Sequence, residues 1–113
     1  MAKTISTKIG TLTIPISSGD SNVLAGEELI NLVGIVFYNP SAFTGTIAVE
    51  VAWAIGTTGA NHQALYSGGS AVTLTAGRVE RWDINGFRSI VLDSSGTEAA
   101  ERVVEVIGIF SLD

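Results

Sequence analysis

The chain has 113 residues, which suits a single domain, and 46% of them are hydrophobic while 15% are charged. Eleven acidic and six basic side chains give a net charge of −5, which argues against a nucleic-acid-binding protein because phosphate contacts need clustered Lys and Arg. There is no cysteine, so disulfides and thiolate metal sites are excluded and the redox compartment stays open.

The first ten residues are thinly apolar and contain both lysines of the chain, Lys3 and Lys8. They predict either an N-terminal edge strand or an arm over residues 1–10, ahead of a β-sandwich domain over residues 11–113. No apolar run of the length that a signal peptide needs follows them. The longest apolar run, residues 32–38, is too short to span a bilayer, so we expect no membrane partner.

The first clearly alternating segment covers residues 11–17, where apolar residues alternate with Thr and Pro. Pro15 cannot donate a hydrogen bond to a neighbouring strand, so it places this strand at an edge or a bulge. The polar residues 17–22 predict a loop after it.

Residues 23–38 are ambiguous between helix and strand. Glu27 and Glu28 fit the start of a helix. Gly34 and the β-branched and aromatic residues around it oppose a helix. We therefore predict a strand over residues 29–38.

The clearest strand signal is at residues 46–54. Apolar side chains on one face alternate with small or polar side chains on the other over the whole segment. The face that should point into the core carries Ile47, Val49, Val51 and Trp53.

The middle of the chain is divided into short strands by glycine-containing turns. A loop is expected over residues 56–61, with turns at residues 67–70, residues 75–78 and the dipeptide Asn85-Gly86. The short strands expected between them cover residues 63–66, 71–74 and 79–84.

The chain is organised around residues 86–110. Two β-rich runs, residues 87–93 and 102–110, flank a polar turn at residues 94–100. Both runs carry apolar residues on both faces, which is typical of strands covered on both sides. We predict that these two runs form the central strand pair of a sandwich.

Eight or nine short strands with frequent turns, and no sustained helical periodicity, predict an all-β, single-domain antiparallel β-sandwich with a jelly-roll-like form. Period-two phasing in three segments also predicts its core. The predicted core residues are Ile47, Val49, Val51, Trp53, Ile90, Leu92, Val104 and Val106.

A hydrolase site would have to use His62, the only histidine. His62 lies beside a glycine-containing loop, and no serine has the sequence pattern of a nucleophile elbow. We therefore expect an exposed loop histidine, no catalytic residue and a protein that is not an enzyme.

Two polar loops place oxygen ligands where calcium is conceivable. They are SSGDS at residues 17–21, with Asp20, and DSSGTE at residues 93–98, with Asp93. Neither has the spacing of a known calcium loop, and the glycine pairs lack the spacing of a phosphate loop. We predict ordinary turns, with no metal and no cofactor.

Three further aromatic residues, Trp82, Phe43 and Tyr66, leave two interpretations open. Core packing is favoured for each. The alternative is an exposed ring that stacks on a sugar or anchors a protein interface.

The order of these segments resembles a known family. The segments are TLTIPIS at residues 11–17, LVGI at 32–35, NPSAFTGT at 39–46, TIAVEVAW at 46–53, GFRSIVLDSSGT at 86–97 and RVVEVIGIF at 102–110. Their order is similar to that in small β-sandwich virion structural proteins of tailed bacteriophages, of the head decoration or cement type. The sequence departs from that pattern in the middle, where AIGTTGAN replaces a Ser-x-Asp-Gly turn.

The resemblance implies a non-enzymatic capsid decoration (cement) protein that stabilises the assembled head shell. Its partners would be the major capsid protein and copies of itself, as a homotrimer. It would be made in the host cytoplasm and located in the virion, on the outer surface of the capsid. The alternative function is a tail-associated or carbohydrate-binding β-sandwich module.

The residues themselves also favour assembly. Apolar side chains on the outer face of a sandwich are costly to leave in water, so a partner surface is the simplest cover. The residues expected to contribute to such outer faces are Leu29, Val33, Ile35, Phe37, Val103, Ile107 and Ile109.

Overall fold

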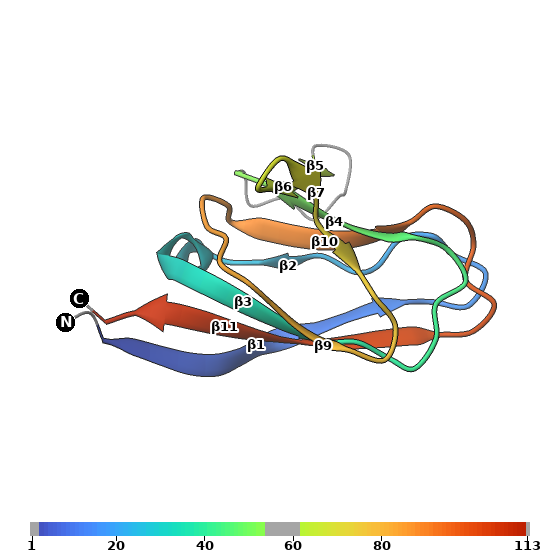
Figure 1. Ribbon diagram of the computed structural model, residues 1–113, viewed down its shortest axis with the longest axis horizontal. Helices are drawn as coiled ribbons and strands as arrows, with labels where there is room; N and C mark the ends of the chain where they lie inside the picture. Colours follow the sequence, from blue (N-terminus) through green and yellow to red (C-terminus); the bar gives the residue numbers. More distant parts are fainter. Residues whose placement is uncertain (1–2, 54–61, 113) are drawn as a thin grey trace.

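The computed structural model describes residues 3–53 and 62–112, and it is a sandwich of two antiparallel β-sheets (Figure 1). This confirms the all-β prediction. The described residues form eleven strands, of which five are only two residues long, and one 3-10 helix. The predicted loop at residues 56–61 and the end of the strand predicted to reach residue 54 lie outside the described residues.

One sheet has four strands in the order β1-β11-β3-β9. Their bounds are β1 (Thr4–Ile14), β11 (Arg102–Ser111), β3 (Leu32–Tyr38) and β9 (Val79–Trp82). β1 is an edge strand that pairs with β11 from Thr4 to Ile14, and Pro15 follows directly after it. Residues 4–10 are therefore the first part of this edge strand.

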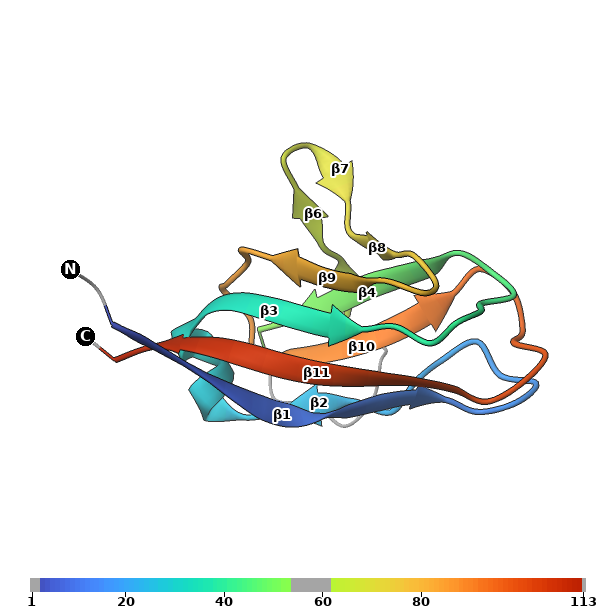
Figure 2. The ribbon, with the colours of Figure 1, turned by 60° about the horizontal axis from the view of Figure 1, so that its bottom comes forward.

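The other sheet has the order β2-β10-β4-β5, with β8 also paired to β4. Their bounds are β2 (Leu24–Ala25), β10 (Ser89–Ser94), β4 (Ile47–Ala52), β5 (Gln63–Ala64) and β8 (Thr73–Leu74). A small hairpin of β6 (Tyr66–Ser67) and β7 (Ser70–Ala71) projects from the body (Figure 2). Its turn uses Gly68 and Gly69, whose φ angles of 63° and 85° favour glycine.

The strand pairing is that of a jelly roll. Four antiparallel pairs nest inside one another, as they would along a single long hairpin. From the outermost pair inwards they are β1·β11, β2·β10, β3·β9 and β4·β8. Rolling this hairpin distributes its pairs alternately between the two sheets. The first and last strands consequently lie side by side (Figure 1).

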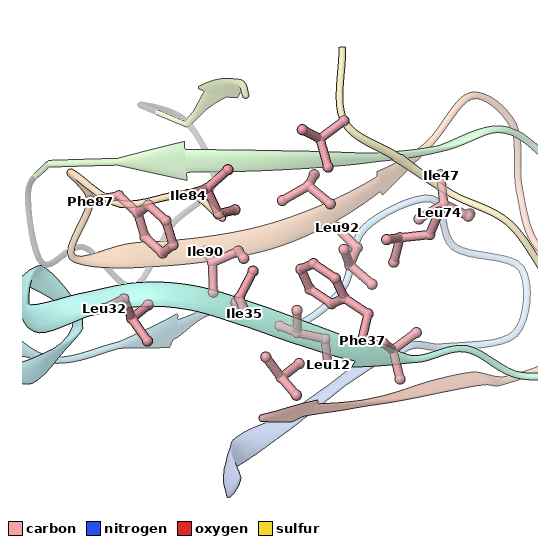
Figure 3. Close-up of a cluster of buried hydrophobic side chains, with 14 of the residues drawn as sticks. Leu12, Leu32, Ile35, Phe37, Ile47, Leu74, Ile84, Phe87, Ile90 and Leu92 are labelled. Carbon is pink, nitrogen blue, oxygen red and sulfur yellow. The ribbon is translucent and has the colours of Figure 1, made fainter. Parts of the chain in front are cut away.

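The core fills the space between the two sheets (Figure 3). Six of the predicted core residues are fully buried, namely Ile47, Val49, Ile90, Leu92, Val104 and Val106. Val51 is half-buried and packs against this core. The four-stranded sheet also contributes Leu12, Ile35 and Phe37, which were not among the predicted core residues.

The prediction for Trp53 is wrong, because 56% of this residue is exposed. β4 ends at Ala52, so Trp53 keeps the phase of the strand but lies beyond its end. Its ring is stacked instead by the guanidinium of Arg88, 4.6 Å from the ring centroid.

The predicted central strand pair is also wrong. β10 lies between β2 and β4 in one sheet, whereas β11 lies between β1 and β3 in the other. Each is central in its own sheet, and the polar turn between them crosses from one sheet to the other. The two-sided apolar pattern reports burial and carries no information on which strand is the partner.

The strand predicted from residue 29 begins later, at Leu32, because Glu27–Asn31 form the 3-10 helix η1. Leu29 of this helix is 3% exposed and closes one end of the core. In the described part of the chain, no helix has the length and apolar content needed to cross a membrane.

Candidate protein-interaction surface

The outer side of the four-stranded sheet carries an apolar patch. Side chains alternate along a strand, so residues that flank the buried Phe37 and Val106 point away from the core. We call the following side chains the outer patch: Val36 and Tyr38 of β3, Val79 of β9, and Val103 and Ile107 of β11.

Strand pairing makes most of the outer patch continuous. The cross-strand pairs on this face are Tyr38 with Val79 and Glu105, and Val36 with Arg81 and Ile107. Directly opposed residues have Cβ atoms about 5 Å apart, so their side chains touch. Val103 lies farther along β11, opposite Thr13 of β1.

The outer patch is open to solvent in the monomer. Tyr38, Val79 and Val103 are 42%, 64% and 41% exposed. Charged residues lie among them, since Glu105 is opposite Tyr38 and Arg81 is opposite Val36, and Lys8 Nζ lies 3.2 Å from Glu105 Oε1. The face therefore combines apolar and aromatic side chains with charged groups, and all of these can contribute to a protein interface.

Four of the seven residues expected on outer faces are buried, which corrects that list. Leu29, Ile35 and Phe37 lie in the core, and Ile109 is only 6% exposed. β3 is apolar on both faces, so its sequence does not show which face points into the core. Its position between β11 and β9 in the sheet decides this. Val33, at 38%, is exposed as expected.

His62 is buried, at 9% exposed, so the prediction of an exposed loop histidine is wrong. Its Nε2 lies 2.8 Å from Oγ of Ser89, which has no exposed surface. His62 Nδ1 has no hydrogen-bond partner among the described residues, so no carboxylate orients the ring as in a catalytic triad. The pair is therefore a buried contact between the residue that precedes β5 and the first residue of β10.

Glu98 is a buried structural carboxylate, at 1% exposed, and its neighbours in the sequence do not indicate this role. Its side chain accepts hydrogen bonds from Thr44 N (2.8 Å), Gly45 N (2.9 Å), Ser94 Oγ (2.7 Å) and Arg102 Nε (2.9 Å). Burial by itself raises the pKa of this carboxyl, but the four donors outweigh burial and lower the pKa to about 2. We call this arrangement the Glu98 hub; it joins the segment before β4 to the start of β11.

The two polar loops considered for calcium lie side by side. Asp20 forms a β-bridge with Asp93, and Glu50 of the adjacent strand β4 is close enough to act on both carboxyls. Nevertheless, no group of three or more His, Cys, Asp or Glu residues in the described ranges could hold a metal ion. Glu98, the last residue of the second loop, is fully used by the hub.

The other aromatic residues divide between the two interpretations. Phe43 and Trp82 are partly buried against the core, which confirms the core interpretation for both. Tyr66, on the β6–β7 hairpin, is 64% exposed, so the core interpretation is wrong for Tyr66.

An open groove of about 390 Å³ is lined by Thr7, Lys8, Ile9, Glu28 and Phe110.

Sequence comparisons give no family, whereas structure comparisons give the fold. No family model and no curated protein match the sequence. The SPBc2 prophage-derived protein YomS has a similar structure, with a TM-score of 0.55 and 13% identity over 96% of this chain and 95% of YomS.

A second similar structure comes from Bacillus endospore appendages, described as a novel family of disulfide-linked pili. Its TM-score is 0.54 at 10% identity, over 100% of this chain and 92% of that one. At these identities the two likenesses establish the shared fold alone.

Proposed function

We propose that this chain is a non-enzymatic structural protein of a tailed-phage virion, and that it decorates the outer surface of the head as a cement protein. In this role it binds the assembled shell in preference to separate capsid subunits and thereby stabilises the shell by mass action. Its contacts are with the major capsid protein and with copies of itself in a homotrimer.

The observation that carries the proposal is the outer patch. Three of its five side chains are more than 40% exposed although they are apolar or aromatic. Covering the part of these side chains that is still exposed contributes about 25 cal/mol per Å² of apolar surface removed from water. The patch lies on a rigid sheet rather than on loops, which keeps its shape fixed before binding.

The similar structures support the same class of function. One is a prophage-derived protein, and the other belongs to appendages that form disulfide-linked pili. This chain has no cysteine, so its own assembly does not use disulfides. Exposed surfaces such as the outer patch are the alternative means of contact.

The test is binding of the purified protein to shells assembled from the major capsid protein of the phage that encodes it. We expect co-sedimentation with shells, a raised melting temperature of the shells, and a mass above 11.7 kDa in light scattering at high concentration. A strict monomer at every concentration that also fails to bind shells would falsify the proposal.

A matched pair of variants connects this test to the outer patch. Val79→Glu should weaken shell binding or trimerisation at least tenfold, because a charge would be buried without a partner. Tyr66→Glu is the control, since Tyr66 and Val79 are equally exposed, at 64%, but lie in different parts of the molecule. Equal loss in both variants would remove the outer patch from the proposal.

A carbohydrate-binding role is the second candidate, and exposed Trp53 is the observation that favours it. The guanidinium of Arg88 covers part of its ring, and Arg88 Nε lies 3.6 Å from Glu27 Oε2. An aromatic ring beside charged groups is a common sugar-stacking arrangement. Binding to a glycan array that Trp53→Ala abolishes would favour this role over the cement role.

A further inference from the structure

The loop between β1 and β2, residues 15–23, is attached to the sandwich in three places. At its start, Ser17 N donates to Glu98 O (2.8 Å) and Glu98 N donates to Ser18 O (2.9 Å). These contacts attach the start of the loop to the backbone of the residue that forms the Glu98 hub.

The middle of the loop, residues 19–21, is attached to β10, whereas Asn22 is held on β1, accepting from Thr13 N (2.7 Å) and donating to Thr11 O (3.0 Å). Ser94 N donates to Gly19 O (2.7 Å), and Ser21 N donates to Leu92 O (3.0 Å). Leu92 N donates to Ser21 Oγ at 2.8 Å, and the bridge between Asp20 and Asp93 lies between these bonds.

This second attachment brings like charges together. The bridge places the Asp20 carboxyl beside that of Asp93, and Glu50 projects from β4 on the same outer face of the sheet. None of the ion pairs among the described residues involves these three carboxyls. Residues 54–61, which the structure does not describe, contain no ionisable side chain.

We propose that the Asp20–Asp93 carboxyl pair is a pH-sensitive latch: residues 19–21 stay on β10 while Asp93 carries its proton, and loss of that proton beside Asp20 and Glu50 releases them. Only this short segment of the loop is released. The first attachment at Ser17 and Ser18 and the core beneath β10 stay in place, because neither depends on this proton.

The direction of the effect follows from the surroundings of Asp93. Burial raises the pKa of Asp93 to about 6, together with the hydrogen bond to Asp20 and the charges of Glu50 and Asp20. Burial and the charge of Asp20 also raise the pKa of Glu50. Above pH 6, therefore, Asp93 becomes a further negative charge beside Asp20 and Glu50, and repulsion acts directly across the bridge.

Amide hydrogen exchange measured by NMR on the full chain tests the latch. We expect the protection factors of the Ser21 and Ser94 amides, corrected for intrinsic exchange, to fall about tenfold between pH 5 and pH 8. The Val49 amide, which donates to Val72 O in the core, should keep its protection and serves as the internal reference.

Two variants complete the test. Asp93→Asn and Asp20→Asn each remove one carboxyl, so protection at pH 8 should equal that at pH 5 in both. Glu105→Gln, an exposed carboxyl on the other sheet, should behave like the wild type. Equal protection at both pH values in the wild type, an equal loss at Val49, or a pH-dependent loss in both Asn variants overturns the proposal.

Discussion

Two carboxyls at the ends of one short turn behave in opposite ways. Glu98 is 1% exposed and its pKa is lowered to about 2, whereas Asp93 is less buried and its pKa is raised to about 6. Burial raises the pKa of both groups. The difference lies in their neighbours, because Glu98 receives four hydrogen bonds and Asp93 faces other carboxyls.

The comparison shows that donors decide the charge state of a buried carboxyl in this fold. At Glu98 a guanidinium, a hydroxyl and two backbone amides replace the lost water, so the ionised form is favoured. At Asp93 burial, a hydrogen bond with Asp20 and the charges of Glu50 and Asp20 all favour the protonated form. The first arrangement holds the turn rigidly, and the second makes its attachment dependent on pH.

The largest expected effect comes from removing the Glu98 hub. Glu98→Ala should destabilise the protein by about 3 kcal/mol or more, because it leaves the Thr44 and Gly45 amides and the Arg102 guanidinium without their buried acceptor. Urea unfolding followed by circular dichroism measures this change.

Glu101→Ala is the control for that experiment, since Glu101 is an exposed carboxyl three residues away. Its effect should stay within about 0.5 kcal/mol. If Glu98→Ala were no more destabilising than Glu101→Ala, the hub would not hold the turn.

The next effect is the pH profile of stability. The pKa of Glu98 is lower in the folded protein than its ordinary value of 4.5, so its contribution is complete above pH 4.5 and is lost as the pH falls towards 2. The pKa of Asp93 is higher than its ordinary value of 3.8, so its contribution is complete below pH 3.8 and is lost as the pH rises through 6.

Together the two groups predict a stability maximum between about pH 4 and pH 5. Thermal unfolding at half-unit intervals from pH 2.5 to 8 should show a steep acid side and a shallow decline towards neutral pH. Glu98→Gln should flatten the acid side selectively. A wild-type profile that rises steadily to pH 8 contradicts the opposite signs assigned to the two carboxyls.

A smaller effect is expected for Asp93→Asn. At pH 8 the variant should be more stable than the wild type by up to about 1 kcal/mol, because repulsion with Asp20 and Glu50 is relieved and partial exposure screens it. At pH 4 the difference should vanish, since Asp93 is then protonated in the wild type. A destabilised variant at pH 8 shows that the ionised Asp93 is favourable.

The smallest expected effect is that of chelation. EDTA should leave the melting temperature unchanged, because the carboxyls of Asp20, Glu50 and Asp93 are too few and too poorly grouped for a structural metal. If EDTA lowered the melting temperature by several degrees and calcium restored it, the acidic loops would bind calcium. A cation, and not a proton on Asp93, would then keep the loop on β10.

The fold was largely predictable from local patterns. The alternation of Ile47, Val49 and Val51 identifies a strand with one core face, and glycine pairs such as Gly68-Gly69 locate turns. Both signals arise from interactions within a few residues, so they survive in any tertiary context.

The candidate surface was predictable only in part. Exposed Val33 and Val103 and half-buried Ile107 agree with the expected outer faces, but Val36, Tyr38 and Val79 were not assigned to one. β3 is apolar on both faces, so its phase could not be read from its own sequence. The pairing of Tyr38 with Val79 and Glu105 determines it.

The sequence by itself therefore determined an all-β sandwich, the inward residues of β4 and the positions of most turns, because side-chain alternation and turn propensity are local properties. Tertiary structure alone decided that β10 and β11 belong to different sheets, that Trp53 lies beyond the core and that His62 is buried against Ser89. It also made one carboxyl of the Asp93–Glu98 turn a charged hub and the other a proton-binding group. Burial, hydrogen-bond donors and like charges come from residues distant in sequence, and these set the environment of each group.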